Sequence, residues 1–405
     1  MNQAGGGGGS ATGGGSATGG GSATGGGSAT GGGSATGGGS ATGGGSASDG
    51  GTPAWRRGMT RWEWRELPST SLSAVAVVNP LTGQAETPSG RVDAWNGLAV
   101  DRARNRVYLA AAGGHHDWAG NEVYELDLSV DAPAWRMLRG PSAAAAIAED
   151  VDTYADGRPA STHLYNALHF VGAHGRVFKL SAGSTWGSGN WSNSHVDAFD
   201  LATNDWDPPG TWDAGTPHGQ AIDRPYAYDL ATDDAYTFFS GQFRRWRAST
   251  GRWETLTARP AYANDDVVLG SPSGFDSSRG RAVFTRNLYR DSTAGGLVVS
   301  ASPQATLSEV TLSGAAVDDA REFGAGMFYL ADEDVFLIKP RTGGEVVRLD
   351  AQTLSATVQP TTGPTPPDSV NGVYTRWLLV PRLGGVLYLP RHSAGVWFLA
   401  TDGTR

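Results

Sequence analysis

A two-strand unit that recurs six times along the chain restricts its fold more than any other feature. Each copy has an apolar strand, a short turn of Asp, Arg, Gly or Asn, and a second apolar strand. The copies read LAVDRARNRVYLAAAGG, ALHFVGAHGRVFKLSAG, AYDLATDDAYTFFSGQ, SGFDSSRGRAVFTRN, MFYLADEDVFLIKP and WLLVPRLGGVLYLPR. Their second strands are anchored on Val107, Val177, Ala235, Ala282, Val335 and Val386, with spacings of 70, 58, 47, 53 and 51 residues. Repeats of about 40–50 residues are typical of β-propeller blades, so the first two blades carry insertions.

The strands inside each copy differ from those that follow it. Both strands of the unit are apolar at nearly every position, which indicates strands covered on both faces. The segments that follow, such as NEVYELDLS with AWRML and EVVRLDAQTLSATV, alternate as a more exposed sheet edge does. Trp135, Trp206 and Trp253 recur after the turns of these outer pairs, where a large ring can wedge between blades. The sequence therefore predicts an all-β propeller of four-stranded blades.

The two chain ends predict how the ring closes. The last blade stops after its third strand, GVWFLATDG, and the alternating segment TRWEWRELP at residues 60–68 has no blade of its own. Pairing this segment with residues 396–401 completes a sixth blade and removes an exposed sheet edge. Seven blades are the alternative, if residues 71–78 nucleate a short extra blade.

The first part of the chain cannot form a core. Residues 2–48 are almost entirely Gly, Ser, Ala and Thr in a six-residue repeat, and such side chains bury too little surface to offset the entropy of ordering. We therefore expect a disordered low-complexity linker over residues 1–52 and a propeller over residues 53–405. The linker is either a tether between an anchor and a head or a passive expansion of GC-rich DNA.

Composition limits the classes of partner and compartment. The net charge of −9 without long charge runs argues against nucleic acid. The absence of cysteine excludes disulfides and thiolate metal sites. No apolar stretch approaches 18 residues, so we expect no membrane span, and no secretion signal is visible after Met1. The abundance of Gly, Trp, Ser and Thr, with only two Lys against 29 Arg, favours an extracellular or cell-envelope protein, although the Arg excess itself reads as genomic.

Several motifs resemble kelch repeats. The pair Gly113–Gly114, the turns DLATNDW and STGRWETL, and the spaced aromatic residues carry this resemblance. The segment GGHHDWAGNEVYELDL is similar to bacterial kelch proteins related to the propeller of galactose oxidase. The resemblance covers residues 53–405, but blades four to six lack the glycine pair. The copper-radical chemistry of galactose oxidase needs a cysteine linked to tyrosine, which this chain lacks.

One face of the predicted propeller collects the polar and aromatic loops. In a four-stranded blade, the loops between second and third strands emerge on the same face as the connections between blades, around one mouth of the central channel. Aromatic rings mixed with Arg, Asn and Asp suit sugars. The candidate ligand-binding residues on this face are His115, His116, Asp117, Trp118, Asn121, His163, Tyr165, Trp186, His195, His218, Arg224, Arg286, Tyr289, Arg321, Glu322 and His392.

The segment GGHHDWAGN is the richest in chemistry. A His-His-Asp run can supply a metal ligand with a supporting carboxylate, and His163 in the next blade connection is expected near His115. His115, Asp117 and His163 are therefore the candidate catalytic residues. Adjacent side chains of an extended segment point in opposite directions, which argues against one ion held by His115 and His116 together. In the alternative interpretation, Asp117 and Asn121 bond loop backbone and one histidine caps the blade.

Three functions are compatible with these observations. The leading hypothesis is a non-catalytic, monomeric recognition head on a flexible tether, which binds a glycan or protein at the mouth without a cofactor. The second is a metal-assisted hydrolase, lyase or epimerase acting on saccharides at the same face. The third is a structural envelope or virion component. The chain has no GxSxG elbow, P-loop, HExxH or EF-hand loop, so the common catalytic templates are absent.

Overall fold

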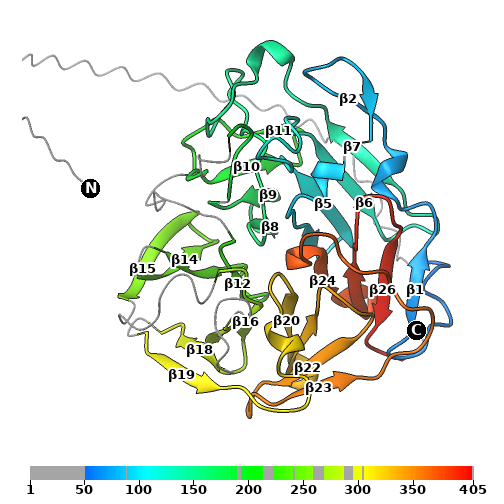
Figure 1. The fold of residues 1–405 in the computed structure, drawn as a ribbon, viewed down its shortest axis with the longest axis vertical. Helices are drawn as coiled ribbons and strands as arrows, with labels where there is room; N and C mark the ends of the chain where they lie inside the picture. The colour runs from blue at the N-terminus through cyan, green and yellow to red at the C-terminus, as the bar shows by residue number, and fades with distance from the viewer. Residues whose placement is uncertain are drawn as a thin grey trace, which may run out of the picture. The chain divides into compact units, whose positions relative to one another are not determined.

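Six four-stranded antiparallel sheets stand radially around one axis and form a β-propeller (Figure 1). The computed structural model describes residues 51–87, 89–181, 183–188, 193–212, 223–239, 242–258, 269–286, 295–302 and 305–403. Residues Asp49–Arg405 form one compact unit. The predicted all-β, six-bladed architecture is confirmed.

The blades follow one another in chain order. Blade 1 contains β4 (Ala99–Asp101), β5 (Arg106–Ala110), β6 (Val123–Asp127) and β7 (Trp135–Arg139). Blade 2 contains β8 (Leu168–Val171), β9 (Arg176–Lys179), β10 (Asp197–Asp200) and β11 (Asp205–Trp206). Blade 3 contains β12 (Ala227–Tyr228), β13 (Ala235–Phe239), β14 (Gln242–Arg247) and β15 (Arg252–Ala258). Blade 4 contains β16 (Ser273–Asp276), β17 (Arg281–Thr285), β18 (Gly295–Ser300) and β19 (Leu307–Thr311).

The last two blades complete the ring. Blade 5 contains β20 (Gly326–Leu330), β21 (Val335–Lys339), β22 (Val346–Asp350) and β23 (Ala356–Gln359). Blade 6 contains β24 (Trp377–Val380), β25 (Gly385–Tyr388), β26 (Val396–Ala400) and, as its outer strand, β1 (Trp64–Leu67). The short 3-10 helices are η1 (Leu72–Ala74), η2 (Ser89–Arg91), η3 (Ala144–Ala146), η4 (Asp319–Arg321), η5 (Ala331–Glu333), η6 (Tyr374–Arg376) and η7 (Pro381–Leu383).

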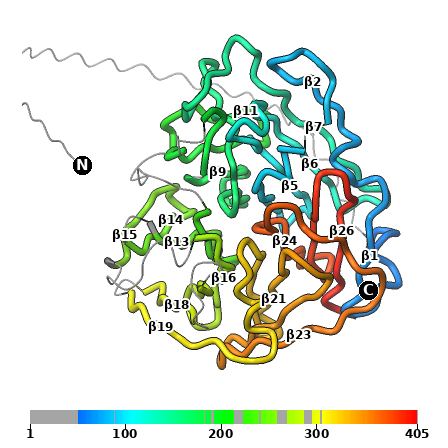
Figure 2. Tube along the Cα trace, in the orientation of Figure 1, coloured from blue at the N-terminus to red at the C-terminus, as the bar shows by residue number. Residues whose placement is uncertain are grey.

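The amino-terminal strand closes the ring as the sequence predicts. Strand β1 pairs antiparallel with β26, with Trp64 opposite Leu399, so the blue and red ends of the trace lie side by side (Figure 2). The Trp64 side chain is buried, with its ring centroid 5.9 Å from that of Trp377 and 6.2 Å from that of Tyr388. The seven-blade alternative is wrong. The strand in residues 71–78 is β2 (Val77–Val78), which forms a two-stranded hairpin with β3 (Ala85–Glu86) rather than a blade.

The innermost strands of all six blades line the channel. A cavity of about 50 Å³ in the channel is bordered by residues such as Ala99, Leu168, Tyr228, Gly274, Met327 and Trp377, one from each innermost strand. The predicted blade wedges Trp135, Trp206 and Trp253 are buried, and the Trp135 indole donates to the Thr70 carbonyl at 2.9 Å. Apolar packing between blades thus leaves little open space along the axis.

Short turns on the face away from the mouth are held by the aspartate that ends a strand. Asp101 Oδ1 accepts from the backbone N–H groups of Ala103 and Arg104 at 2.9 and 3.0 Å. Asp350 Oδ1 accepts from the N–H of Thr353 at 2.7 Å in the same way. These Asx-type turns satisfy backbone donors within three residues of the aspartate. We call this side of the ring the turn face.

The only two lysines occupy equivalent places in the repeat. Lys179 and Lys339 are the last residues of β9 and β21, the second strands of blades 2 and 5, and both are fully buried. Lys179 Nζ lies 2.9 Å from Asp197 Oδ2. Lys339 Nζ donates to the carbonyls of Pro340 and Gly343, and burial lowers the pKa of this amine to about 8.

In the described part of the chain, no helix is both long and apolar enough to span a bilayer.

Candidate binding face at one mouth of the channel

The segments that enter the innermost strands share an unusual backbone conformation. Each contains a residue with positive φ two to four positions before its inner strand, and four of the six are not glycine. The six residues are Trp95 (φ 55°), Tyr165 (φ 49°), Asp223 (φ 53°), Gly270 (φ 65°), Gly324 (φ 73°) and Tyr374 (φ 49°). Bulky residues adopt this left-handed region at a cost, so the surrounding structure must hold them there.

Backbone hydrogen bonds join these residues from one blade to the next. Tyr165 N–H donates to the Trp95 carbonyl at 2.7 Å, and Gly324 N–H donates to the Gly270 carbonyl at 2.8 Å. Gly270 N–H donates in turn to Asp223, and Tyr374 N–H donates to Gly324. These bonds link the six residues at four of the six blade junctions, and we call the six residues the mouth belt. The side of the ring that carries it is the mouth face.

Side chains of the mouth belt meet over the end of the channel. The rings of Tyr165 and Tyr374 lie 5.4 Å apart, edge to face, although they precede blades 2 and 6. The Tyr374 hydroxyl donates to Asp223 Oδ1 at 3.1 Å, which brings in the segment before blade 3. Burial, and after it the negative charge of Asp223, raises the pKa of both phenols. The two tyrosines therefore remain neutral.

The HHD segment projects beside the mouth belt on a tight turn. His115 and His116 both have positive φ, 36° and 60°, and both side chains are exposed, as is that of Asp117. The expected extended geometry, which would send adjacent side chains in opposite directions, is wrong here. The two imidazole rings lie 6.4 Å apart with their planes only 25° from parallel.

Glycine is required beneath this turn. Gly114 has φ 81°, and a Cβ there would lie 2.3 Å from the Ser184 carbonyl oxygen and 2.6 Å from His163 N. Gly114 N–H donates to the Trp118 carbonyl, and His115 N–H donates to the Thr185 carbonyl at 2.9 Å. The turn is thereby fixed against blade 2 as well as blade 1.

His163 lies next to the turn, as the sequence predicts. Its Nε2 is 2.8 Å from Asp117 Oδ2, and its ring centroid is 5.8 Å from that of His115. Trp95 and Tyr165 of the mouth belt pack on the same imidazole, which is only 3% exposed. Burial lowers the pKa of His163, and the Asp117 carboxylate opposes that shift. His163 therefore supports the exposed Asp117 from below.

Two of the predicted residues form a buried support under the turn. Trp118 is 3% exposed, and its indole N–H donates to both oxygens of Glu122 at 3.1 and 2.9 Å. Asn121 donates to the Ser142 hydroxyl and to the Pro159 carbonyl. The Asn121 carboxamide is thus bonded to groups of the surrounding loops. Burial raises the pKa of Glu122, which the indole donor partly offsets.

Further histidines on the mouth face each lie near a carboxylate from another segment. His392 Nδ1 is 2.8 Å from Asp93 Oδ2, and His195 Nε2 is 3.3 Å from Asp152 Oδ2. His116 Nε2 lies 3.5 Å from Glu149 Oε1. Trp186 is half-buried, and its ring is 5.2 Å from the His116 ring.

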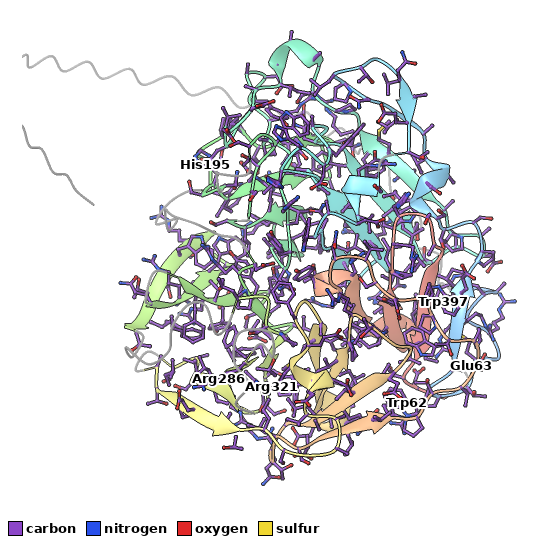
Figure 3. All side chains as sticks on the ribbon, viewed as in Figure 1. Trp62, Glu63, His195, Arg286, Arg321 and Trp397 are labelled. Carbon is purple, nitrogen blue, oxygen red and sulfur yellow. The ribbon has the colours of Figure 1, made fainter. Side chains whose placement is uncertain are left out.

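The remaining predicted residues lie elsewhere on the face or inside it. His195 in blade 2 is well separated from Arg286 and Arg321 in Figure 3. Arg224 and Arg321 are buried; Arg224 Nη1 donates to Ser181 Oγ, and Arg321 Nε donates to the Arg286 carbonyl. Arg286 pairs with Glu309, and Glu322 accepts the Arg341 N–H at 2.6 Å. His218 and Tyr289 lie outside the described residues.

Several residues that shape the mouth face were not among those predicted from the sequence. Trp95, Tyr374, Asp93 and Glu149 contact predicted residues there, and Asp223 accepts from the Tyr374 hydroxyl. The sequence does contain a pattern that points to them. An aromatic residue occurs in WNG, YNA and VYT, and each of these tripeptides precedes an innermost strand. Aligning the segments before the repeats would therefore have identified these mouth-belt residues.

The turn face also holds a cavity. It has a volume of about 660 Å³ and is lined by parts of blades 3 to 6. Phe275, Leu330 and Leu379 contribute apolar surface, whereas Asp332 and Glu333 contribute carboxylates. Glu333 is already paired with Arg61 at 2.5 Å and with Arg348. A cavity therefore lies on the face with the short turns, so the length of the loops does not by itself predict where the cavities of this propeller are.

Among the residues that the structure describes, no group of three or more His, Asp or Glu side chains is arranged to hold a metal ion. Asp117, His163 and His115 form a chain of neighbours, with the two imidazole centroids 5.8 Å apart.

Comparison with known proteins gives similarity to solved structures alone. No family model matches the chain, and no curated protein matches it. The chain is similar to a protein of unknown function from Bacteroides thetaiotaomicron, with 12% identity, a TM-score of 0.45 and coverage of 83% of this chain and 75% of that one. It is also similar to a chain in a nidogen–laminin complex, with 8% identity, a TM-score of 0.40 and coverage of 79% and 89%. Likenesses this distant carry no argument about what the chain binds.

Proposed function

We propose that the propeller is a recognition module whose mouth face binds a glycan. The contact surface consists of His115, His116, Asp117 and Trp186. The observation that carries the proposal is the turn at His115 and His116, where two non-glycine residues with positive φ present three adjacent exposed polar side chains. Backbone conformations of this kind persist only where the surrounding structure enforces them, and they cluster at ligand sites.

The layer below the turn supports this assignment. Asp117 is fixed by His163, and His116 is placed between Glu149 and Trp186. Side chains held in one arrangement lose little conformational entropy when a ligand binds. An aromatic ring beside imidazole and carboxylate groups offers a sugar both an apolar face and hydrogen-bond partners.

Two finer inferences belong to the same proposal. The kelch relationship rests on the Gly113–Gly114 pair, whose backbone allows the close approach of blade 2. Display outside the cell rests on the composition of the chain and on its glycine-rich leader.

A glycan array probed with the full chain tests the proposal. We expect binding to a subset of glycans, lost by at least tenfold in His116→Ala and Trp186→Ala, whose side chains contribute little to the core. Gln352→Ala on the turn face is the control and should leave binding unchanged. Equal binding by all three variants, or capture of a protein with no array signal, would contradict the glycan assignment.

A metal-assisted enzyme is a second candidate, favoured by one observation. Asp117, His163 and His115 form a continuous group at the mouth face. A catalytic base must reach the substrate, and a metal ligand must reach the ion. Of these three residues, His115 and Asp117 are exposed and can do so, whereas His163 is buried. Metal analysis of untagged protein and of His115→Ala decides this candidate. A stoichiometric ion in the wild type that is lost in the variant supports it, and an equal metal content in both removes it.

A further inference from the structure

A cleft between blades 1 and 2 concentrates arginine in an otherwise acidic chain. Its volume is about 340 Å³, and Arg104, Arg106 and Arg136 line it together with Glu125. Three guanidinium groups thus line one cleft of a protein whose net charge is −9. The cleft lies away from the His115 turn and is built from blade residues and turn-face loops.

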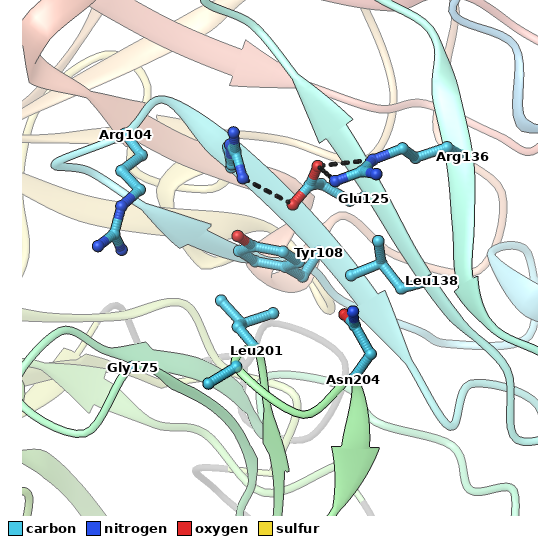
Figure 4. Close-up of a pocket in the computed structure, with 10 residues that line it drawn as sticks. Arg104, Tyr108, Glu125, Arg136, Leu138, Gly175, Leu201 and Asn204 are labelled. Carbon is cyan, nitrogen blue, oxygen red and sulfur yellow. Dashed lines mark hydrogen bonds and ion pairs between the residues drawn. The ribbon is translucent and has the colours of Figure 1, made fainter. Parts of the chain in front are cut away.

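A buried carboxylate fixes two of the guanidinium groups. Glu125 is 2% exposed, and its Oε1 accepts from Nε and Nη2 of Arg136 at 2.9 and 2.7 Å. Its Oε2 accepts from Nη1 of Arg106 at 3.4 Å. Figure 4 shows Arg136 bonded to Glu125 on the blade 1 side of the cleft.

The arginines keep donors for a further acceptor. Arg104 is held through Nη1 by Asp101 at 3.0 Å, and its side chain is 64% exposed; that of Arg136 is 63% exposed. In the described part of the chain, Nη2 of Arg104 and Nη1 of Arg136 donate no internal hydrogen bond. The carboxylates of Asp101, Glu125 and Asp127 offset the three positive charges of the arginines. The cleft would therefore select a ligand by the orientation of its N–H donors and not by an excess of positive charge.

The rest of the lining suits a ring with hydroxyl groups. Leu138 of blade 1 and Leu201 of blade 2 supply apolar walls, and the Asn204 carboxamide lies beside them (Figure 4). Burial, with the charge of Glu125 behind it, raises the pKa of the Tyr108 phenol, which therefore stays a neutral hydroxyl beside Glu125. Apolar walls with a few placed polar groups are the usual composition of a small-molecule site.

We propose that this cleft binds a carboxylate-bearing sugar. The carboxylate would accept from the unused Nη2 donor of Arg104, and a ring hydroxyl would accept from the unused Nη1 donor of Arg136. The sugar ring would lie between Leu138 and Leu201, with a hydroxyl on Asn204. This site is separate from the glycan surface proposed on the mouth face.

Titration of the full chain with D-glucuronate, D-glucose and sulfate, followed by calorimetry or ligand-observed NMR, tests the proposal. We expect glucuronate to bind at least tenfold more tightly than either glucose or sulfate. Equal affinity for glucuronate and glucose would remove the carboxylate from the recognition. Equal affinity for glucuronate and sulfate would remove the sugar ring.

Variants locate the binding. Arg136→Gln and Arg104→Gln should each weaken glucuronate binding at least tenfold, whereas Arg139→Gln on the same strand as Arg136 but outside the cleft lining should not. Ala202→Trp fills the cleft from an exposed turn without touching an ion pair, and should abolish binding in a protein that still folds. Retained binding in Ala202→Trp overturns the site. His116→Ala should leave glucuronate binding unchanged, which separates this test from that of the mouth face.

Discussion

The two faces of the ring are held together in different ways. On the turn face, Asp101 and Asp350 satisfy backbone N–H groups two or three residues away. On the mouth face, partners are distant in sequence: Asp93 with His392 is separated by 299 positions, and Tyr374 with Asp223 by 151. The aspartate turns can form within one hairpin, but the Asp93–His392 and Tyr374–Asp223 contacts form only after blades far apart in the chain have come together.

This difference indicates which positions of a repeat fold can vary and so provide binding specificity. Local turns repeat because every blade needs the same reversal, so their residues are alike. Contacts across blade junctions are made once each, and so they can differ without disturbing the repeat. We expect closure and junction contacts to carry the largest free energies, and single turn-face residues the smallest.

The largest effect should come from the closing strand. Trp64→Ala empties a buried site beside Trp377, Tyr388 and Trp397, and should lower the free energy of unfolding by about 3–5 kcal/mol. Trp62→Ala removes a partly exposed ring two residues away and should cost clearly less. Denaturant titration of both variants makes the measurement. Similar losses for the two would mean that the closing strand is not anchored by Trp64.

Next in size is the buried support of the mouth face. Trp118→Phe keeps most of the ring volume but removes the N–H donor to Glu122, and should cost about 2–3 kcal/mol. Raising the pH should worsen this variant relative to wild type, because the pKa of Glu122 is already raised by burial and would rise further without its donor. Denaturation at pH 6 and pH 8 checks both points. A loss that is small and independent of pH would contradict the support role.

Acid should destabilise the ring through a histidine in the innermost strand of blade 2. Burial lowers the pKa of His169 to about 4, opposed by Asp233. The unfolded chain binds this proton near pH 6.5 and the folded chain only near pH 4, so the free energy of unfolding falls as the pH drops. The loss between pH 7 and pH 5 should be about 2 kcal/mol.

His169→Gln removes that proton and should flatten this part of the pH dependence. The pKa of His163 is shifted in the same direction, so a smaller slope should remain. Unfolding curves of both proteins at pH 7 and pH 5 provide the comparison, and parallel slopes would contradict the assignment to His169.

The smallest effect should come from a turn-face aspartate. Asp350→Ala removes the acceptor for two backbone N–H groups in an exposed turn and should cost about 0.5–1 kcal/mol. Backbone hydrogen bonding lowers the pKa of Asp350, so this contribution is present above pH 4 and is lost as the pH falls below it. A loss as large as that of Trp118→Phe would erase the contrast between the faces.

Sequence reasoning reached the fold because its determinants are periodic and local. Apolar strand pairs, Asp-centred turns and the unpaired segment at residues 60–68 together determine six blades and their closure. The proximity of His163 to His115 was also accessible, because both lie in adjacent loops of neighbouring blades.

Other features of the mouth face could not be predicted, because they depend on distances between blades that the repeat pattern does not specify. Trp118 was expected among contact residues, but the positive φ of His115 and His116 turns it inward onto Glu122. The meeting of Tyr165 with Tyr374 depends on the width of the channel. Neither could be obtained from spacing, because each requires the relative placement of whole blades.

The burial of both lysines has a practical consequence for anyone who labels this molecule. An amine-reactive ester meets no lysine Nζ on the surface of the folded ring, because Lys179 and Lys339 are enclosed in blades 2 and 5. Acylation of either lysine therefore requires its blade to open. Mass spectrometry of the acylated peptides would thus follow the opening of two separate blades in one unmodified protein, with no fluorophore or engineered probe.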